Sequence, residues 1–187
     1  MLTNEEILDD AIAAATRLQS QRSKLNGYCL KAVEKFKDGN VQDGRSAFYQ
    51  WFNGMLTHRK KLEFALKGKG VNFPNHELGS LKIAIEECVA LKSVEEAAKR
   101  VDGNKMRTTV ESALESVIQP YEDELKSEVG KPGTSLGVWS AWLNRKGKLY
   151  SFVKDYFECW NLIAESVIVC CAQLRKRGKS YWDVDID

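Results

Sequence analysis

The chain has 187 residues, of which 43% are hydrophobic and 29% are charged, and its formal net charge is +2. This length and composition are typical of one soluble globular domain and argue against intrinsic disorder. The small net charge also argues against a dedicated binder of duplex DNA, because such proteins carry a strong excess of Lys and Arg.

The cysteines and the N-terminus indicate the compartment. Five cysteines occur without the spacing of a disulfide framework or a CxxC metal site: Cys29, Cys88, Cys159, Cys170 and Cys171. The first ten residues, MLTNEEILDD, are acidic and begin a helix, so they lack the basic and apolar regions of a signal peptide. We therefore expect a cytoplasmic, reducing location.

The first predicted helix begins at residue 4. Thr3 and Glu6 have the spacing of a capping box, in which each side chain binds the backbone N–H of the other residue. Apolar residues then recur every three or four positions and predict one helix over residues 4–37. The apolar stripe is interrupted at position 21 or 22, and a bend is expected at residues 26–27.

A polar turn, DGN at residues 38–40, separates this helix from a second amphipathic helix over residues 43–67. The two helices are predicted to form an antiparallel hairpin. Shorter helices are expected after Asn75, which is a typical N-cap, and after Ser93, which has the capping-box spacing with Glu96.

The remaining chain is predicted to contain two longer helices. One begins near Lys105 and is expected to kink or restart at Pro120, because proline inside a helix costs about 3 kcal/mol. The other begins at residue 135 or 136 and ends at Arg177, with Gly147 as the candidate position for a break. Apolar residues cover most of the circumference of its second half, which is typical of a central helix that others pack around.

These segments predict an all-α fold. We expect a single-domain bundle of about six helices over residues 1–179, with a long central C-terminal helix. An aromatic and acidic tail, SYWDVDID at residues 180–187, follows the bundle. Because no segment alternates apolar and polar residues with a period of two, no sheet is expected.

Residues 92–118 resemble a helix-turn-helix motif in the pattern SxEEAAxxx, a turn and then TVxxAL. The resemblance implies DNA contacts at the start of the second helix, from Lys105, Arg107, Thr108 and Thr109. The turn is longer than in the usual motif, and the acidic residues Glu111 and Glu115 follow, where they oppose the approach of phosphate. An ordinary helical hairpin is the alternative interpretation.

Sequence patterns of known enzymes are absent. His58 and His76 are the only histidines, and neither has the HExxH or Glu-x-x-His spacing of helical metal sites. No GxSxG sequence occurs, and GKPGTS reverses the order of a phosphate-binding loop. We therefore predict no enzymatic activity, no catalytic residue, no metal and no cofactor. His58 is the best candidate if an unfamiliar helical active site is present.

Aromatic residues near the C-terminus are the predicted anchors for a partner. Four are expected to be exposed, two in the last helix and two in the tail: Trp139, Trp142, Tyr181 and Trp182. Aromatic side chains contribute much of the binding energy in protein interfaces. The leading hypothesis is a non-enzymatic intracellular protein that binds a macromolecule, either another protein or copies of itself.

The alternative hypothesis is binding of RNA or single-stranded DNA. Basic residues with aromatic neighbours can hold phosphates while the bases stack. The candidate residues are Arg59, Lys60, Lys61, Lys67, Lys69, Arg145, Lys146, Lys148, Arg175, Lys176, Arg177 and Lys179. Several lie near predicted helix C-termini, where cations also stabilise the helix dipole.

A membrane span is not expected. Residues 160–174 form an apolar stretch of fifteen residues that includes Asn161 and Glu165, which is too short and too polar to cross a bilayer. The neighbouring pair Cys170 and Cys171 continues the apolar stripe and is expected to serve packing.

Overall fold

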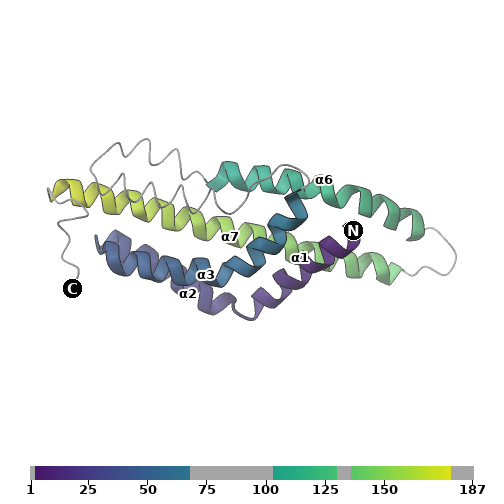
Figure 1. The fold of residues 1–187 in the computed structure, drawn as a ribbon, viewed down its shortest axis with the longest axis horizontal. Coiled ribbons are helices and arrows are strands. Elements are labelled where there is room, and N and C mark those ends of the chain that lie inside the picture. Colours follow the sequence, from purple (N-terminus) through teal and green to yellow (C-terminus); the bar gives the residue numbers. More distant parts are fainter. Residues whose placement is uncertain (1–2, 68–102, 130–135, 178–187) are drawn as a thin grey trace.

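The computed structural model describes residues 3–67, 103–129 and 136–177, and within these ranges the chain forms five α-helices and no strand. The helices are α1 (Asn4–Gln19), α2 (Arg22–Lys37), α3 (Val41–Leu66), α6 (Gly103–Val129) and α7 (Leu136–Lys176) (Figure 1). The all-α prediction is therefore confirmed. The helices predicted after Asn75 and Ser93, and the tail at 180–187, lie outside the described residues.

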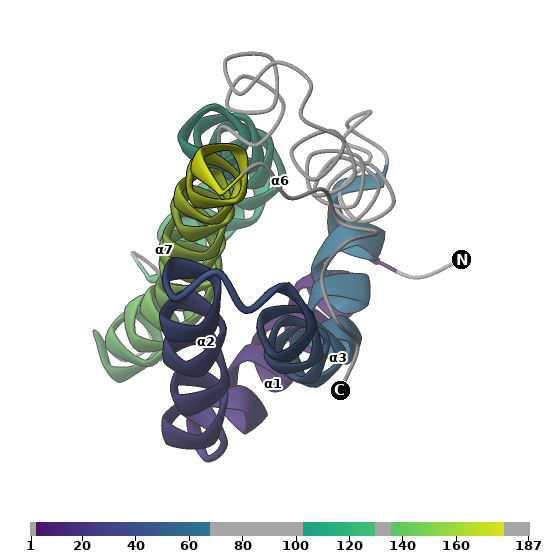
Figure 2. The ribbon, with the colours of Figure 1, turned by 90° about the vertical axis from the view of Figure 1, so that its left-hand side faces the viewer.

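Helix α7 organises the molecule. It has 41 residues, which corresponds to a length of about 60 Å at 1.5 Å per residue. It packs against each of the other four described helices. Figure 1 shows α6 along the N-terminal half of α7, and α2 with part of α3 along its C-terminal half. The end-on view in Figure 2 shows α2, α3 and α7 arranged around the middle of the molecule, and each of these helices contributes buried core residues.

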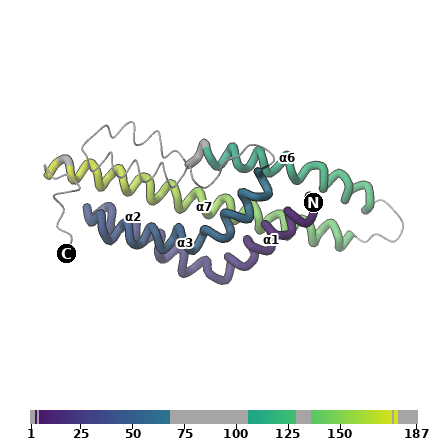
Figure 3. The backbone as a smooth tube through the Cα atoms, in the orientation of Figure 1, coloured from purple at the N-terminus to yellow at the C-terminus, as the bar shows by residue number. Residues whose placement is uncertain are grey.

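The first two helices are separate. The prediction of one helix over residues 4–37 was wrong, because the chain leaves the helical conformation at Gln21, where φ is −105° and ψ is 1°. The Ser20 hydroxyl donates a 2.8 Å hydrogen bond to the carbonyl of Arg17, and such local bonds compete with helix propagation. Figure 3 shows the resulting change of direction. It falls where the apolar stripe is interrupted, and not at the bend predicted for residues 26–27.

A tight turn joins α2 to α3. Gly39 has a φ of 78°, a left-handed conformation that glycine adopts without strain. The side chain of Asn40 caps α3 by accepting a 3.1 Å hydrogen bond from the backbone N–H of Asp43. The end of α7 also reaches this turn, because the Gln173 side chain donates a hydrogen bond to the carbonyl of Lys37. The turn is therefore held from two sides.

Two predicted interruptions do not occur. Helix α6 continues through Pro120 and α7 continues through Gly147, so the predicted restart and the predicted break were wrong. Pro120 itself is exposed, whereas Val117, Ile118 and Glu122 around it are buried. We infer that the packing of these neighbours offsets the helix penalty of proline, which is about 3 kcal/mol.

The core is aromatic where α3 faces α7. Trp51 stacks on Tyr156 with ring centroids 5.3 Å apart, and Phe48 meets Trp160 edge to face at 6.5 Å. All four side chains are buried. Large aromatic rings contribute much of the burial free energy of a core, and ring pairs in these geometries add to it.

Helix α7 is long and apolar enough to cross a membrane by length and composition, over Leu136–Leu174. The core helix of a soluble protein passes the same test, and 56% of the most apolar window is buried inside the protein. The expectation that the chain has no membrane span stays a prediction.

Candidate functional site

The described residues contain no group of three or more His, Cys, Asp or Glu side chains that could hold a metal ion. His58 is half-buried in α3, with its ring centroid 6.2 Å from that of Phe152. Burial lowers the pKa of His58, the positive charge of Arg17 lowers it further, and a backbone hydrogen bond at Ala14 acts in the opposite direction. The lowered pKa keeps His58 mostly neutral near pH 7.

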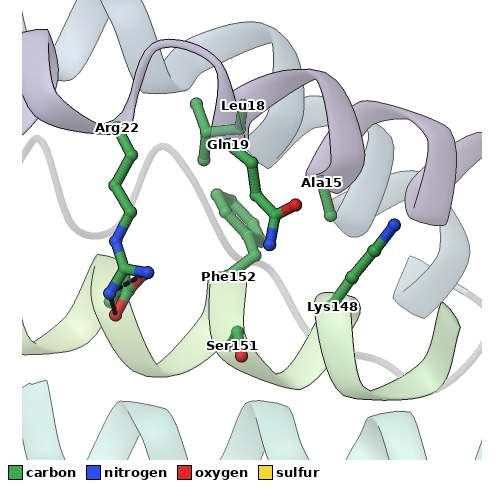
Figure 4. A pocket seen from close by; sticks show the side chains of 8 residues that line it. Ala15, Leu18, Gln19, Arg22, Lys148, Ser151 and Phe152 are labelled. Atoms are coloured by element: carbon green, nitrogen blue, oxygen red, sulfur yellow. Dashed lines mark hydrogen bonds and ion pairs between the residues drawn. The ribbon is translucent and has the colours of Figure 1, made fainter. Parts of the chain in front are cut away.

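An open pocket lies where α1 ends and α2 begins, beside the middle of α7. Figure 4 shows Arg22 and Lys148 at its two ends, with Phe152 between them. Arg22 forms a 3.1 Å ion pair with Asp155, so its charge is compensated. The pocket therefore presents one of the predicted basic residues, Lys148. Its lining residues are Ala15, Leu18, Gln19, Arg22, Lys148, Ser151, Phe152 and Asp155.

Trp142 is not a surface anchor. Only 3% of its surface is exposed, so the expectation that it is available to a partner was wrong. Its ring meets Tyr121 edge to face at 4.7 Å, and its Nε1 donates a 2.9 Å hydrogen bond to Oε1 of Glu122. The reason is its place on α7, where it faces α6 and joins the two helices.

Glu122 is a buried carboxylate with two donors. Besides the indole of Trp142, Nζ of Lys146 lies 2.8 Å from the same Oε1 atom. Burial raises the pKa of Glu122, but the hydrogen bonds from Lys146 and Trp142 and the charge of Lys146 outweigh it, so the pKa lies below its usual value. The group is therefore ionised near pH 7, and the charge of Lys146 is used inside the protein.

The first two turns of α7 expose several large apolar side chains. Leu136, Val138 and Leu143 are 77%, 45% and 46% exposed, and Trp139 is partly buried beside the core. Leu136, Trp139 and Leu143 have i, i+3, i+7 spacing and so lie on one side of the helix. Nζ of Lys126 lies 5.5 Å from the centroid of the Trp139 ring. We call these four α7 residues the apolar end.

Arg59 is buried, which corrects its prediction as a surface contact for nucleic acid. Only 2% of its surface is exposed. Its guanidinium carbon lies 4.2 Å from the centroid of Phe52, and its Nη1 donates a 3.3 Å hydrogen bond to the hydroxyl of Tyr156. Arg59 lies four residues after Met55 and three before Leu62, both buried, so it belongs to the apolar stripe of α3.

Three other predicted basic residues have acidic partners within the chain. Lys61 lies 3.3 Å from Asp10, Arg145 forms an ion pair with Asp9, and Lys146 binds Glu122 as described above. Further members of the set are exposed: Lys60, Lys67, Lys176 and Arg177. Lys69, Lys179 and the side chain of Arg175 lie outside what the structure describes, as do the predicted anchors Tyr181 and Trp182. The basic residues are therefore spread over several helices with different surroundings.

The described cysteines are all buried: Cys29, Cys159, Cys170 and Cys171. Burial raises the pKa of Cys170 to about 11, although the positive charge of Arg177 lowers it in part. Cys29 of α2 and Cys159 of α7 are in direct contact, because Sγ of Cys29 donates a 3.8 Å hydrogen bond to the carbonyl of Cys159. The sequence does not reveal this contact, because 130 positions separate the two residues.

No family model, no curated protein and no solved structure matches this chain. Within the described residues the protein is all-α. The candidate site is therefore inferred only from the positions and exposure of its residues. The apolar end adds Leu136, Val138 and Leu143 to the predicted anchor Trp139. A signal for them is present in the segment LGVWSAWL, which is too rich in large apolar residues for a single buried stripe.

Proposed function

We propose that this chain is a non-enzymatic cytoplasmic protein that binds another protein or a second copy of itself through the apolar end of α7. The proposal includes the finer architecture, a single-domain bundle of about six helices with a C-terminal docking tail. The observation that carries it is the exposure of three large apolar side chains beside Trp139 within residues 136–143. Gathered apolar groups of this kind are typical of interaction sites.

The position of the apolar end supports the proposal. In Figure 1 the start of α7 and the end of α6 extend past the N-terminus of α1. An i, i+3, i+7 stripe is also the pattern by which one helix docks against another. Trp139 supplies the kind of large aromatic group that contributes most in interfaces.

The test compares two double variants with the same spacing on the same helix. Leu136→Asp with Leu143→Asp places charges on the apolar end, while Leu162→Asp with Val169→Asp places them on another exposed stretch of α7. Leu162 and Val169 are 46% and 40% exposed, so the control is closely matched. Size-exclusion chromatography with light scattering measures self-association, and pull-down from the native host measures partner binding.

We expect the first double variant to lose the complex and the control to keep it, with equal helix content by circular dichroism. The proposal fails if two results are found together: the wild-type protein stays monomeric up to the highest soluble concentration, and the pull-downs with the two double variants recover the same partner proteins. It also fails if both variants lose the complex equally.

The second candidate function is binding of RNA or single-stranded DNA. The observation that favours it is the exposure of Lys176 and Arg177 at the end of α7, next to a tail that contains two further aromatic residues. Binding of this kind weakens steeply with salt. Lys176→Ala with Arg177→Ala should weaken binding to a fluorescent oligonucleotide and reduce the slope of affinity against salt. Absent or salt-insensitive binding would exclude this function.

A further inference from the structure

Two thiols that are distant in sequence meet between α2 and α7. Cys29 and Cys159 are 1% and 8% exposed, and Sγ of Cys29 donates to the carbonyl of Cys159 at 3.8 Å. Sγ of Cys159 in turn donates a 3.9 Å hydrogen bond to Oδ1 of Asn26, one turn before Cys29 on α2. Residues Cys29 and Cys159 are thus in direct contact, and each thiol has a hydrogen-bond partner on the facing helix.

The environment makes the two thiols chemically unequal. Interaction with the side chain of Cys159 and burial both raise the pKa of Cys29. Interaction with the side chain of Cys29 lowers the pKa of Cys159, although burial acts against it. Because the thiolate is the nucleophile, and because Cys159 is also the more exposed of the two, Cys159 is the sulfur that meets an oxidant first.

We propose that Cys29 and Cys159 are a redox site, at which hydrogen peroxide drives formation of a disulfide that links α2 to α7. The Cys159 thiolate attacks one peroxide oxygen, which forms a sulfenic acid and releases hydroxide. The sulfur of Cys29 then attacks the Cys159 sulfur, its proton passes to the departing hydroxyl group, and water leaves. In total, two thiols lose two electrons and two protons, and one peroxide molecule is reduced to two water molecules.

Cys170 and Cys171 are a contrasting case on the same helix. Each is 2% exposed, and consecutive residues of one helix point in different directions around it. Burial also keeps the Cys170 thiol protonated near pH 7, with a pKa of about 11. The vicinal pair, although more conspicuous in the sequence, is therefore not the reactive one.

The first test uses the wild-type full-length protein. Folded protein is treated with hydrogen peroxide and then unfolded in the presence of an alkylating reagent, and the peptides are analysed by mass spectrometry without reduction. We expect a linked peptide that contains Cys29 and Cys159, lighter than the sum of its parts by two hydrogen atoms. Reduction should restore both thiols. The proposal is overturned if Cys159 is over-oxidised without a link, or if links to other cysteines form equally often.

A second test separates the two steps. In Cys29→Ser the sulfenic acid of Cys159 has no thiol to attack it, so a dimedone-type probe should label Cys159 more strongly than in the wild type. Cys170→Ala is the matched control and should behave as the wild type. Circular dichroism checks that each variant is folded. Equal labelling of Cys159 in folded Cys29→Ser and wild type would contradict the mechanism.

The link also has a physical readout. It would close a loop between positions 130 residues apart, and a loop of this size strongly restricts the unfolded chain. Oxidised protein should therefore unfold at a higher denaturant concentration than reduced protein, and the difference should disappear in Cys29→Ser. No change in the midpoint of a fully linked sample would show that the bond strains the native packing. That result would overturn the assignment of a pre-formed site.

Discussion

Nε1 of Trp142 and Oε1 of Glu122 form a 2.9 Å hydrogen bond that joins α7 to α6. The carboxylate belongs to a residue that is only 6% exposed, and Lys146 shares the same oxygen. An indole N–H and an ammonium group thus compensate a charge that burial alone would disfavour. This contact explains why Trp142 is buried between two helices, whereas the nearby Trp139 is only partly buried at the edge of the core.

Trp142→Phe should therefore destabilise the protein more than Trp139→Phe. The first change keeps a ring beside Tyr121 but removes a hydrogen bond to a buried charge, so we expect a loss of about 1.5–3 kcal/mol in the free energy of unfolding. The second should change it by about 0.5 kcal/mol or less, as is usual for residues near the surface. Urea denaturation followed by circular dichroism measures both. Similar losses for the two variants would contradict the different roles assigned to them.

Arg59→Ala should act on stability and not on a binding surface. The change removes the donor to Tyr156 and the cation over Phe52 from the interior, and we expect a loss of about 2 kcal/mol or more. Lys60→Ala, at the exposed neighbouring position, should stay within about 0.5 kcal/mol of the wild type. Thermal denaturation compares the two. If Arg59→Ala weakened oligonucleotide binding but left the melting temperature unchanged, the assignment of Arg59 to the stability of the core would be wrong.

Replacing Gly44 of α3 and Gly147 of α7 with alanine should have opposite effects on stability. A Cβ atom at Gly44 would lie 2.6 Å from Cδ1 of Phe36, so Gly44→Ala should force α2 and α3 apart and cost about 1–3 kcal/mol. A Cβ atom at Gly147 would meet no atom within 4 Å. Gly147→Ala should instead stabilise α7 by about 0.5–1 kcal/mol, because alanine favours the helix. A melting temperature of Gly44→Ala at or above that of the wild type would refute this packing of α2 on α3.

His58 predicts a loss of stability in mild acid. Burial holds its pKa in the folded protein below the ordinary value of 6.5, so the unfolded chain takes up a proton at higher pH than the folded protein does. The stability contributed by neutral His58 is complete above pH 6.5, the pKa in the unfolded chain. This contribution falls as the pH drops below 6.5 and is lost once the pH is below the pKa of His58 in the folded protein. The free energy of unfolding of His58→Gln, measured across this range, should fall less steeply than that of the wild type.

Local signals in the sequence predicted the start of α1 and the limits of α7. The capping box of Thr3 and Glu6 is present, with both reciprocal hydrogen bonds to the backbone, because its atoms lie within one turn of helix. The long last helix also forms close to its expected limits. The break at Ser20 and Gln21 was not predicted, because it depends on backbone angles that the spacing of apolar residues does not specify.

The exposure of individual side chains was harder to predict than the helices. Arg59 belongs to a run of basic residues, HRKK, yet its angular position places it in the interior between Met55 and Leu62. Trp142 could be recognised as buried only once α6 was known to lie beside it. The contact between Cys29 and Cys159 likewise requires the tertiary fold. Helical periodicity predicts which residues share a face, but the neighbouring helix decides whether that face is covered.

The place of α7 in the chain has a consequence for synthesis. Trp51 and Phe48 of α3 obtain their stacking partners, Tyr156 and Trp160, from a helix that the ribosome makes about a hundred residues later. Until α7 emerges, these aromatic rings lack the surface that covers them in the finished protein. Folding of this core must therefore wait until α7 has been made, and before that stage the growing N-terminal helices are where chaperones would matter most.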